Sequence, residues 1–370
     1  MRSISHYSLC FHGNLHPFLT DHPPHFTVMS PLITPANLIN TLPLTAKAAQ
    51  TITQARLILE NILSGKDDRL VVVIGPCSIH DPTSAYEYAE KLRGQIEKHQ
   101  DSLCIIMRTY FEKARTSVGW KGLINDPDLN ETFELNKGLE ITRSLLIAIN
   151  ELGVPAGAEI INPLAVPYFS DLISWSVIGA RTTESQLHRE IASHLPMPVG
   201  FKNNTNGDIQ VAIDAVQTAQ QPHHFLHADH AGKIAIMRST GNPYCHIVLR
   251  GSNQQSNYDS DTINQAITSL NRLDLMNRVM VDCSHGNSKK NPTQQIIALR
   301  QLVTRIASGD TQIFGIMSES HLMAGKQTWI PNQLLQYGQS ITDACIGWSD
   351  TELILDELSQ AVQLHKETIT

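Results

Sequence analysis

The chain reads Val71-Val72-Val73-Ile74-Gly75-Pro76-Cys77-Ser78 where its architecture is easiest to recognise. The β-branched run is typical of a strand buried on both faces, as in a parallel sheet. Gly75 and Pro76 break the regular pattern, so the chain turns there. We therefore expect Cys77 at the carboxyl end of a buried strand, where α/β proteins carry their functional residues. A lone cysteine there is more often a small apolar plug. The same arrangement recurs down the chain, however, with a different polar residue each time.

Seven further apolar runs of this kind follow, and helical patterns separate most of them. The expected strands lie at 103–107, 156–161, 176–180, 198–201, 246–249, 279–281 and 313–317. Amphipathic helices are expected near 44–64, 83–98, 132–152, 262–272, 293–307 and 350–366, with others after 185 and 202. A β-hairpin near 223–242 interrupts this rhythm. An eight-fold alternation favours an α/β fold of the (β/α)8 TIM-barrel type over a doubly wound sheet.

Composition limits the classes of partner. The chain has 370 residues, 41% of them hydrophobic, and a formal charge of −7, which argues against nucleic acid and acidic membranes as partners. No apolar run is long enough to span a bilayer. The six cysteines are scattered without a CxxC pair, so a reducing cytoplasm is the expected location. Residues 1–28 hold five histidines and no lysine, and we expect a disordered extension there. Residues 29–370 are then expected to form one barrel domain.

A first set of polar residues at the expected strand ends suits a metal ion. In a barrel those ends converge on one face, so residues far apart in sequence become neighbours. A thiolate, an imidazole and two carboxylates together suit a borderline divalent metal such as Mn, Fe, Co or Zn. Any one of these residues alone could simply cap a strand, but the four together favour a metal site. They are Cys77, His285, Glu319 and Asp343.

A second set of residues suits anions. Six cations on one face of an acidic protein call for negatively charged ligands, and arginine binds phosphate or carboxylate in a bidentate manner. Surface ion pairs would explain any one of them alone. The six are Arg108, Lys113, Arg115, Arg181, Lys202 and Arg250. Neither a Walker loop nor a G-x-G-x-x-G motif follows any strand, so a phosphorylated substrate is favoured over a nucleotide. A metal beside such a pocket could polarise an aldehyde or activate water, and the residues alone leave both open.

Several motifs resemble one enzyme family. They are Gly75–Pro82 (GPCSIHDP), Arg108–Lys113 (RTYFEK), Gly119–Leu123 (GWKGL), Gly179–Ser185 (GARTTES), Gly200–Asn203 (GFKN) and Ser340–Asp343 (SITD). Their order closely resembles that of the type I 3-deoxy-D-arabino-heptulosonate 7-phosphate (DAHP) synthases of the feedback-regulated bacterial and fungal branch, from about residue 30 to 366. The resemblance implies a cytoplasmic transferase that condenses phosphoenolpyruvate with erythrose 4-phosphate and opens the shikimate pathway to chorismate and aromatic amino acids. It also implies a homodimer or homotetramer.

The resemblance assigns roles to individual residues. Cys77, His285, Glu319 and Asp343 match the family's metal ligands. The phosphoenolpyruvate region is matched by Arg108, Lys113, Glu159, Arg181, Lys202 and Arg250, and the phosphate site for erythrose 4-phosphate by Arg115 and Thr116. Lys113, Glu159 and His285 are the candidates for moving protons. An aromatic amino acid effector is also implied, although Asn162–Pro167 and His194–Met197 differ from the family where the effector binds.

Departures from the family pattern leave alternatives open. Ala114 replaces a proline, Asn204 and Ser252 replace glycines, and Asn206 replaces an aspartate. One alternative is a synthase for another aldose phosphate, such as a 3-deoxy-octulosonate 8-phosphate synthase, against which the Lys-x-Arg-Thr loop argues. A second is a catalytically silent regulatory paralogue, which would need a lost ligand or cation. A class II aldolase would require a histidine-rich zinc site.

Overall fold

The computed structural model describes residues 30–115, 118–330 and 333–369. The chain divides into two units, residues 1–32 and 33–370, and the following paragraphs concern the second. The expected extension at 1–28 and the candidate residue Thr116 lie outside the described residues.

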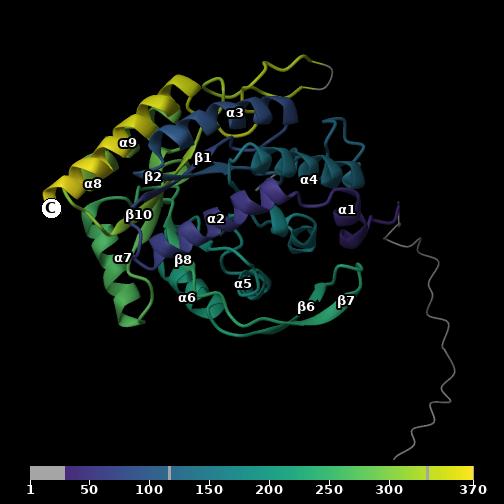
Figure 1. The fold of residues 1–370 in the computed structure, drawn as a ribbon, viewed down its shortest axis with the longest axis horizontal. Helices are drawn as coiled ribbons and strands as arrows, with labels where there is room; N and C mark the ends of the chain where they lie inside the picture. Colours follow the sequence, from purple (N-terminus) through teal and green to yellow (C-terminus); the bar gives the residue numbers. More distant parts are fainter. Residues whose placement is uncertain (1–29, 116–117, 331–332, 370) are drawn as a thin grey trace, which may run out of the picture. The chain divides into compact units, whose positions relative to one another are not determined.

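Eight parallel strands close into a barrel in the order β1-β10-β9-β8-β5-β4-β3-β2 (Figure 1). Their bounds are β1 Leu70–Gly75, β2 Leu103–Arg108, β3 Ala156–Glu159, β4 Trp175–Ile178, β5 Val199–Lys202, β8 Cys245–Leu249, β9 Val279–Asp282 and β10 Ile313–Glu319. The predicted (β/α)8 barrel is therefore confirmed. Some predicted strand ends were wrong: β3 stops at Glu159, shortly before a 3₁₀ helix that begins at Pro163, and β10 continues to Glu319 because it stays paired with β1.

Helices cover the outside of the barrel. Their bounds are α1 Pro35–Thr41, α2 Ala46–Leu63, α3 Pro82–His99, α4 Leu135–Glu151, α5 Gln186–Ala192, α6 Gln210–Ala219, α7 Ser260–Arg272, α8 Pro292–Ala307 and α9 Trp348–Ile369. Between β3 and β4 the chain forms two short 3₁₀ helices, η1 Pro163–Tyr168 and η2 Ser170–Leu172, and a third, η3 His285–Ser288, follows β9. Pro167 explains the lack of an α-helix before β4, because proline inside a helix removes a hydrogen bond.

Local signals place the helix starts. Asp81 accepts hydrogen bonds from the backbone N–H groups of Thr83 and Ser84, and Pro82 occupies the first helical position of α3. Asn291 and Pro292 begin α8 in the same way. These caps fix where each helix leaves the loop that follows a strand, and so fix the loops that carry polar residues.

The barrel interior is a packed core, closed by α2 at one end. Leu59, Ile62 and Leu63 of α2 pack with the inward side chains of the strands, including Trp175 and Phe314. Small residues make room for the large ring: a Cβ atom at Gly200 would lie 3.1 Å from Trp175. With that end filled, chemistry is restricted to the opposite, carboxyl-terminal mouth.

The expected hairpin is present as β6 (His224–Ala228) and β7 (Ile234–Arg238), an antiparallel pair outside the barrel. One face buries Phe225 and His227, while Leu226 and Ile236 on the other face are exposed. Within the ranges that the structure describes, no helix combines the length and apolar character needed to cross a membrane.

Candidate active site and metal centre

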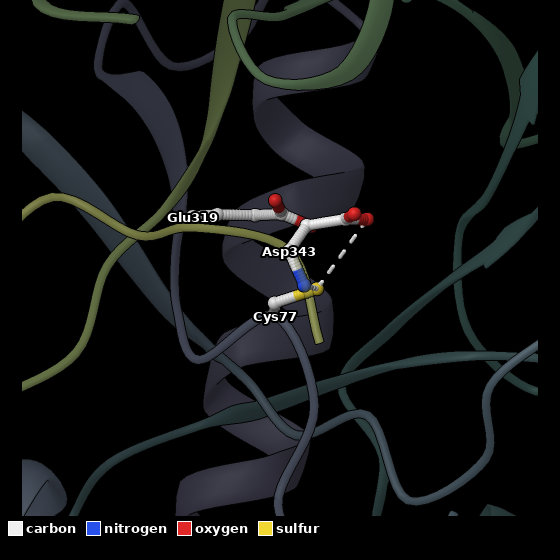
Figure 2. A group of neighbouring side chains, drawn as sticks. All are labelled: Cys77, Glu319 and Asp343. Carbon is white, nitrogen blue, oxygen red and sulfur yellow. Dashed lines mark hydrogen bonds between the residues drawn. The ribbon is translucent and has the colours of Figure 1, made fainter. Parts of the chain in front are cut away.

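Three candidate metal ligands meet at the mouth of the barrel. Cys77 follows β1 by two residues, Glu319 ends β10, and the two strands are paired through Gly75 and Glu319. Asp343 comes from the loop between β10 and α9. One donor atom from each of the three lies within 4.8 Å of the others (Figure 2). Sequence positions far apart are therefore joined into one compact donor group.

His285, the fourth candidate, stands beside this group rather than inside it. Its Nε2 lies 3.6 Å from Glu319 Oε1, and its Nδ1 donates to Asp282 Oδ2 over 2.9 Å. The hydrogen bond to a buried carboxylate fixes the ring and leaves Nε2 available, as is usual for histidines that bind metals. His285 also has a left-handed backbone with φ +56, which a non-glycine residue adopts only under local constraint.

The donor set fits a divalent transition metal. Buried anions need cations close by, and sulfur, carboxylate oxygen and imidazole nitrogen together suit a borderline metal. Burial raises the pKa of the Cys77 thiol to about 11, with Glu319 raising it further and Lys113 opposing this. A cation is thus required for Cys77 to act as a thiolate ligand.

Lys113 contacts two of the same donors. Its Nζ lies 2.9 Å from Cys77 Sγ and 3.3 Å from Asp343 Oδ2. Burial alone would raise the pKa of Asp343, but Lys113 and Lys290 outweigh burial and hold that pKa below its ordinary value. The carboxylate is therefore ionised and ready to bind a cation at neutral pH.

Three further predicted cations lie near the buried acids Glu319 and Asp282. They are Arg108, Lys202 and Arg250. Arg108 is fully buried, donates to Glu319 Oε1 over 3.2 Å and stacks 3.8 Å from the ring of Tyr110. Lys202 donates to Asp282 Oδ2 over 2.8 Å. Burial lowers the pKa of Arg250, and Arg181 lowers it further while Asp282 opposes this, so Arg181 and Arg250 feel each other's charge. Arg181 and Arg115 are themselves exposed.

Two further carboxylates come from the end of β3 and from the loop after β2. Glu159 ends β3, and a Cβ atom at Gly179 would come within 2.1 Å of its Oε1, so the glycine leaves room for the carboxylate. Glu112 is buried and accepts a hydrogen bond from the N–H of Asn162. Burial raises the pKa of Glu112 to about 7, and nearby Glu159 adds to the increase.

Sequence reasoning missed several residues of this site. Asp282 joins His285 to Lys202, Lys290 pairs with Asp343, and Glu112 was passed over inside a quoted motif. A signal for Asp282 was available, because a charged residue closed an otherwise apolar strand. Three buried amides also connect the loops that carry Arg250 and His285 through hydrogen bonds. They are Asn203, Asn257 and Asn287.

The segments expected to bind an effector also meet in the structure. The ring of Phe225 on β6 lies 6.2 Å from that of His194 and 6.3 Å from that of His227. His227 Nε2 is 3.0 Å from the carbonyl oxygen of Pro163 at the start of η1. The hairpin, the segment after α5 and the start of η1 therefore form one contact region.

Comparison with known proteins gives a consistent result. A model of the DAHP synthetase I family matches residues 42–356. The chain is 50% identical over 331 residues to the phospho-2-dehydro-3-deoxyheptonate aldolase of Haemophilus influenzae, covering 90% of this chain and 91% of that protein. It is 49% identical to the Trp-sensitive and Phe-sensitive phospho-2-dehydro-3-deoxyheptonate aldolases of Escherichia coli K12, covering 90% of this chain and 95% of each.

A solved structure gives the same picture at the level of the fold. The phospho-2-dehydro-3-deoxyheptonate aldolase of Francisella tularensis SCHU S4 superimposes with a TM-score of 0.90 at 45% sequence identity. The match covers 92% of this chain and 99% of that structure.

Proposed function

Because the chain belongs to the DAHP synthetase I family, we propose that it condenses phosphoenolpyruvate with erythrose 4-phosphate and water to give DAHP and inorganic phosphate. This is a transferase reaction and the first step of the shikimate pathway. The observation that carries the proposal is the gathering of Cys77, Glu319 and Asp343, with His285 beside them, next to buried cations at one mouth of the barrel.

The family is metal-dependent, and we propose Mn, Fe, Co or Zn as the ion of this protein. Cys77, His285, Glu319 and Asp343 would hold it, since their donor atoms converge and their chemistry suits such an ion. When bound, the ion supplies a Lewis acid for the aldehyde oxygen of erythrose 4-phosphate. Asp282 orients His285 by accepting a hydrogen bond from its Nδ1–H.

The buried cations are proposed to bind phosphoenolpyruvate. Lys202 and Arg250, with Arg181 nearby, would hold its phosphate and carboxylate, because guanidinium groups bind such anions in pairs of hydrogen bonds. Arg108 is already committed to Glu319 and the Tyr110 ring, so it contributes fixed positive charge beside the carboxylate. The result is a substrate fixed with its methylene carbon toward the aldehyde.

The loop after β2 is proposed to bind erythrose 4-phosphate through Arg115 and Thr116. Carbon 3 of phosphoenolpyruvate then attacks the aldehyde carbon, and the aldehyde oxygen gains a proton. Water adds at carbon 2 and loses one proton, and the resulting hydroxyl loses its second proton as the carbonyl forms and the phosphate leaves with its bridging oxygen. Lys113, Glu159 and His285 are the proposed proton carriers, with Glu159 near the developing positive charge at carbon 2.

An assay of phosphate release tests the proposal. Purified protein with phosphoenolpyruvate and a panel of aldose phosphates should release phosphate with erythrose 4-phosphate and form the seven-carbon product, and the chelator-treated protein should not. Preference for arabinose 5-phosphate would favour the octulosonate alternative. Absence of turnover with every aldose phosphate in metal-loaded protein would favour the silent paralogue.

We propose three further properties on the same basis. The region around His194, Phe225 and His227 is proposed to take an aromatic amino acid effector, as the names of the Trp-sensitive and Phe-sensitive relatives suggest. The protein is proposed to be a cytoplasmic homodimer or homotetramer. Residues 29–370 are proposed to be one domain, with residues 1–28 dispensable for folding.

A further inference from the structure

The side chain of Lys290 contacts the candidate metal ligand that comes from a long loop. Its Nζ lies 3.0 Å from Asp343 Oδ1. The other oxygen of the same carboxylate, Oδ2, lies 3.8 Å from Cys77 Sγ and 3.3 Å from Lys113 Nζ. The two oxygens therefore have different partners: Oδ2 faces the donor group, and Oδ1 faces Lys290.

The backbone that presents Lys290 is unusual. Lys289 and Lys290 have φ values of +51 and +59, two consecutive left-handed residues that are not glycine. Such residues persist only where their surroundings enforce the conformation, and they are concentrated at functional sites. The N–H of Lys290 donates to the carbonyl oxygen of His285, so η3 and the two left-handed residues form one closed turn. One turn therefore presents a candidate ligand, His285, and the lysine that contacts another.

The two lysines at Asp343 have opposite relations to a bound metal. Lys113 Nζ contacts Cys77 Sγ and Asp343 Oδ2, the atoms that a metal would use, so Lys113 competes with the metal for them. Lys290 contacts only Oδ1 of the carboxylate, and its own side chain is 51% exposed at the rim. Its ion pair can therefore remain in place when Oδ2 binds a metal.

We propose that Lys290 is a positioning residue for the metal centre: by holding Asp343 Oδ1, it directs Oδ2 toward Cys77 and Glu319. The proposal rests on the proposed function, because it assigns Asp343 to the metal. Partners that hold a ligating carboxylate typically change metal affinity by about 10- to 100-fold. Half-exposed ion pairs contribute at the lower end of such ranges, so a loss of about tenfold is expected here.

The test compares four full-length proteins: wild type, Lys290→Met, Lys290→Arg and Lys289→Met. Lys289 is the matched control, because it is also exposed and left-handed, and among the described residues its ammonium forms no ion pair. Each protein is treated with a chelator and titrated with cobalt(II), and the thiolate-to-cobalt absorption band reports binding at Cys77. Melting temperatures of the metal-free proteins and KM for erythrose 4-phosphate are measured in parallel.

The expected result is a cobalt Kd raised about tenfold in Lys290→Met, restored to within about threefold in Lys290→Arg and unchanged in Lys289→Met. Equal affinity in Lys290→Met and wild type overturns the proposal. So does an unchanged cobalt affinity with a raised KM for erythrose 4-phosphate, since Lys290 would then contact substrate. A metal-free Lys290→Met protein that melts far below metal-free wild type shows a structural role instead. If wild type itself gives no thiolate band, the metal centre of the proposed function fails together with this proposal.

Discussion

The buried carboxylate of Glu112 predicts a measurable dependence of stability on pH. Its side chain is only 6% exposed, and burial raises its pKa from 4.5 to about 7. Between these pH values the folded protein binds more protons than the unfolded chain, so the stabilisation present at low pH is lost as pH rises toward 7. At 1.36 kcal/mol per pH unit, the free energy of unfolding should fall by about 2–3 kcal/mol between pH 5 and pH 8 through this group alone.

The variant Glu112→Gln removes this titration while keeping an oxygen that can accept from the N–H of Asn162. Urea unfolding of the variant and wild type is measured at several pH values, and only the difference between the two is used, so that other groups cancel. The difference should shift in favour of the variant by about 2–3 kcal/mol from pH 5 to pH 8. Glu97→Gln is the control, because that side chain is 63% exposed and its ion pair with Arg93 lies at the surface, where such pairs contribute little. A pH-independent difference for Glu112→Gln would refute the reasoning.

Three further outcomes are expected. Cys77→Ala should be inactive even with excess Mn, Co or Fe, because the one sulfur of the donor group is lost, and a phosphate-release assay checks this. Ala114→Pro should lower the KM for erythrose 4-phosphate a few-fold and leave the KM for phosphoenolpyruvate nearly unchanged, because ordering a stiffer loop costs about 0.4–1 kcal/mol less. Arg115→Ala should change the KM for erythrose 4-phosphate far more, by raising it. Inhibition by Phe, Tyr or Trp should be weak or altered, because Asn162–Pro167 and His194–Met197 differ from the family at the proposed effector site; strong inhibition at micromolar concentration contradicts this.

The barrel could be predicted because its strands carry local signals. In runs such as Val71–Ile74 every residue is β-branched, and that composition is typical of a strand buried on both faces. The short helix α1 was missed, although Thr34 caps it and Pro35 begins it, because one buried leucine gives no periodic pattern. The room that Gly200 leaves for Trp175 could not be predicted either, since it depends on which strands are neighbours.

The candidate ligands could be proposed because parallel strands in a barrel bring their carboxyl ends to one mouth. The ion pairs between these ligands and cations could not be predicted, because they depend on how far side chains reach from one loop to another. Lys113 and Lys290 lie far from Asp343 in sequence, and both contact it. Lys290 also depends on a left-handed turn at residues that are not glycine, for which the sequence carries no local signal.

The charges at the mouth explain why this site needs both sets of residues at once. Asp282 and Glu319 are fully buried, and such anions would be costly without partners in the low-dielectric interior. Burial alone would raise the pKa of Asp282, but Lys202 and His285 outweigh burial and hold that pKa well below its ordinary value. The pKa of Glu319 is also lowered, by His285, Lys113 and Arg108. Glu319 and Asp343, two of the candidate metal ligands, are therefore stabilised by Lys113, a candidate for substrate binding, and Asp282, which holds His285, is stabilised in the same way by Lys202. Substitution of Lys202, a proposed phosphate-binding cation, is therefore expected to weaken the proposed metal centre too, through the hydrogen bonds of Asp282.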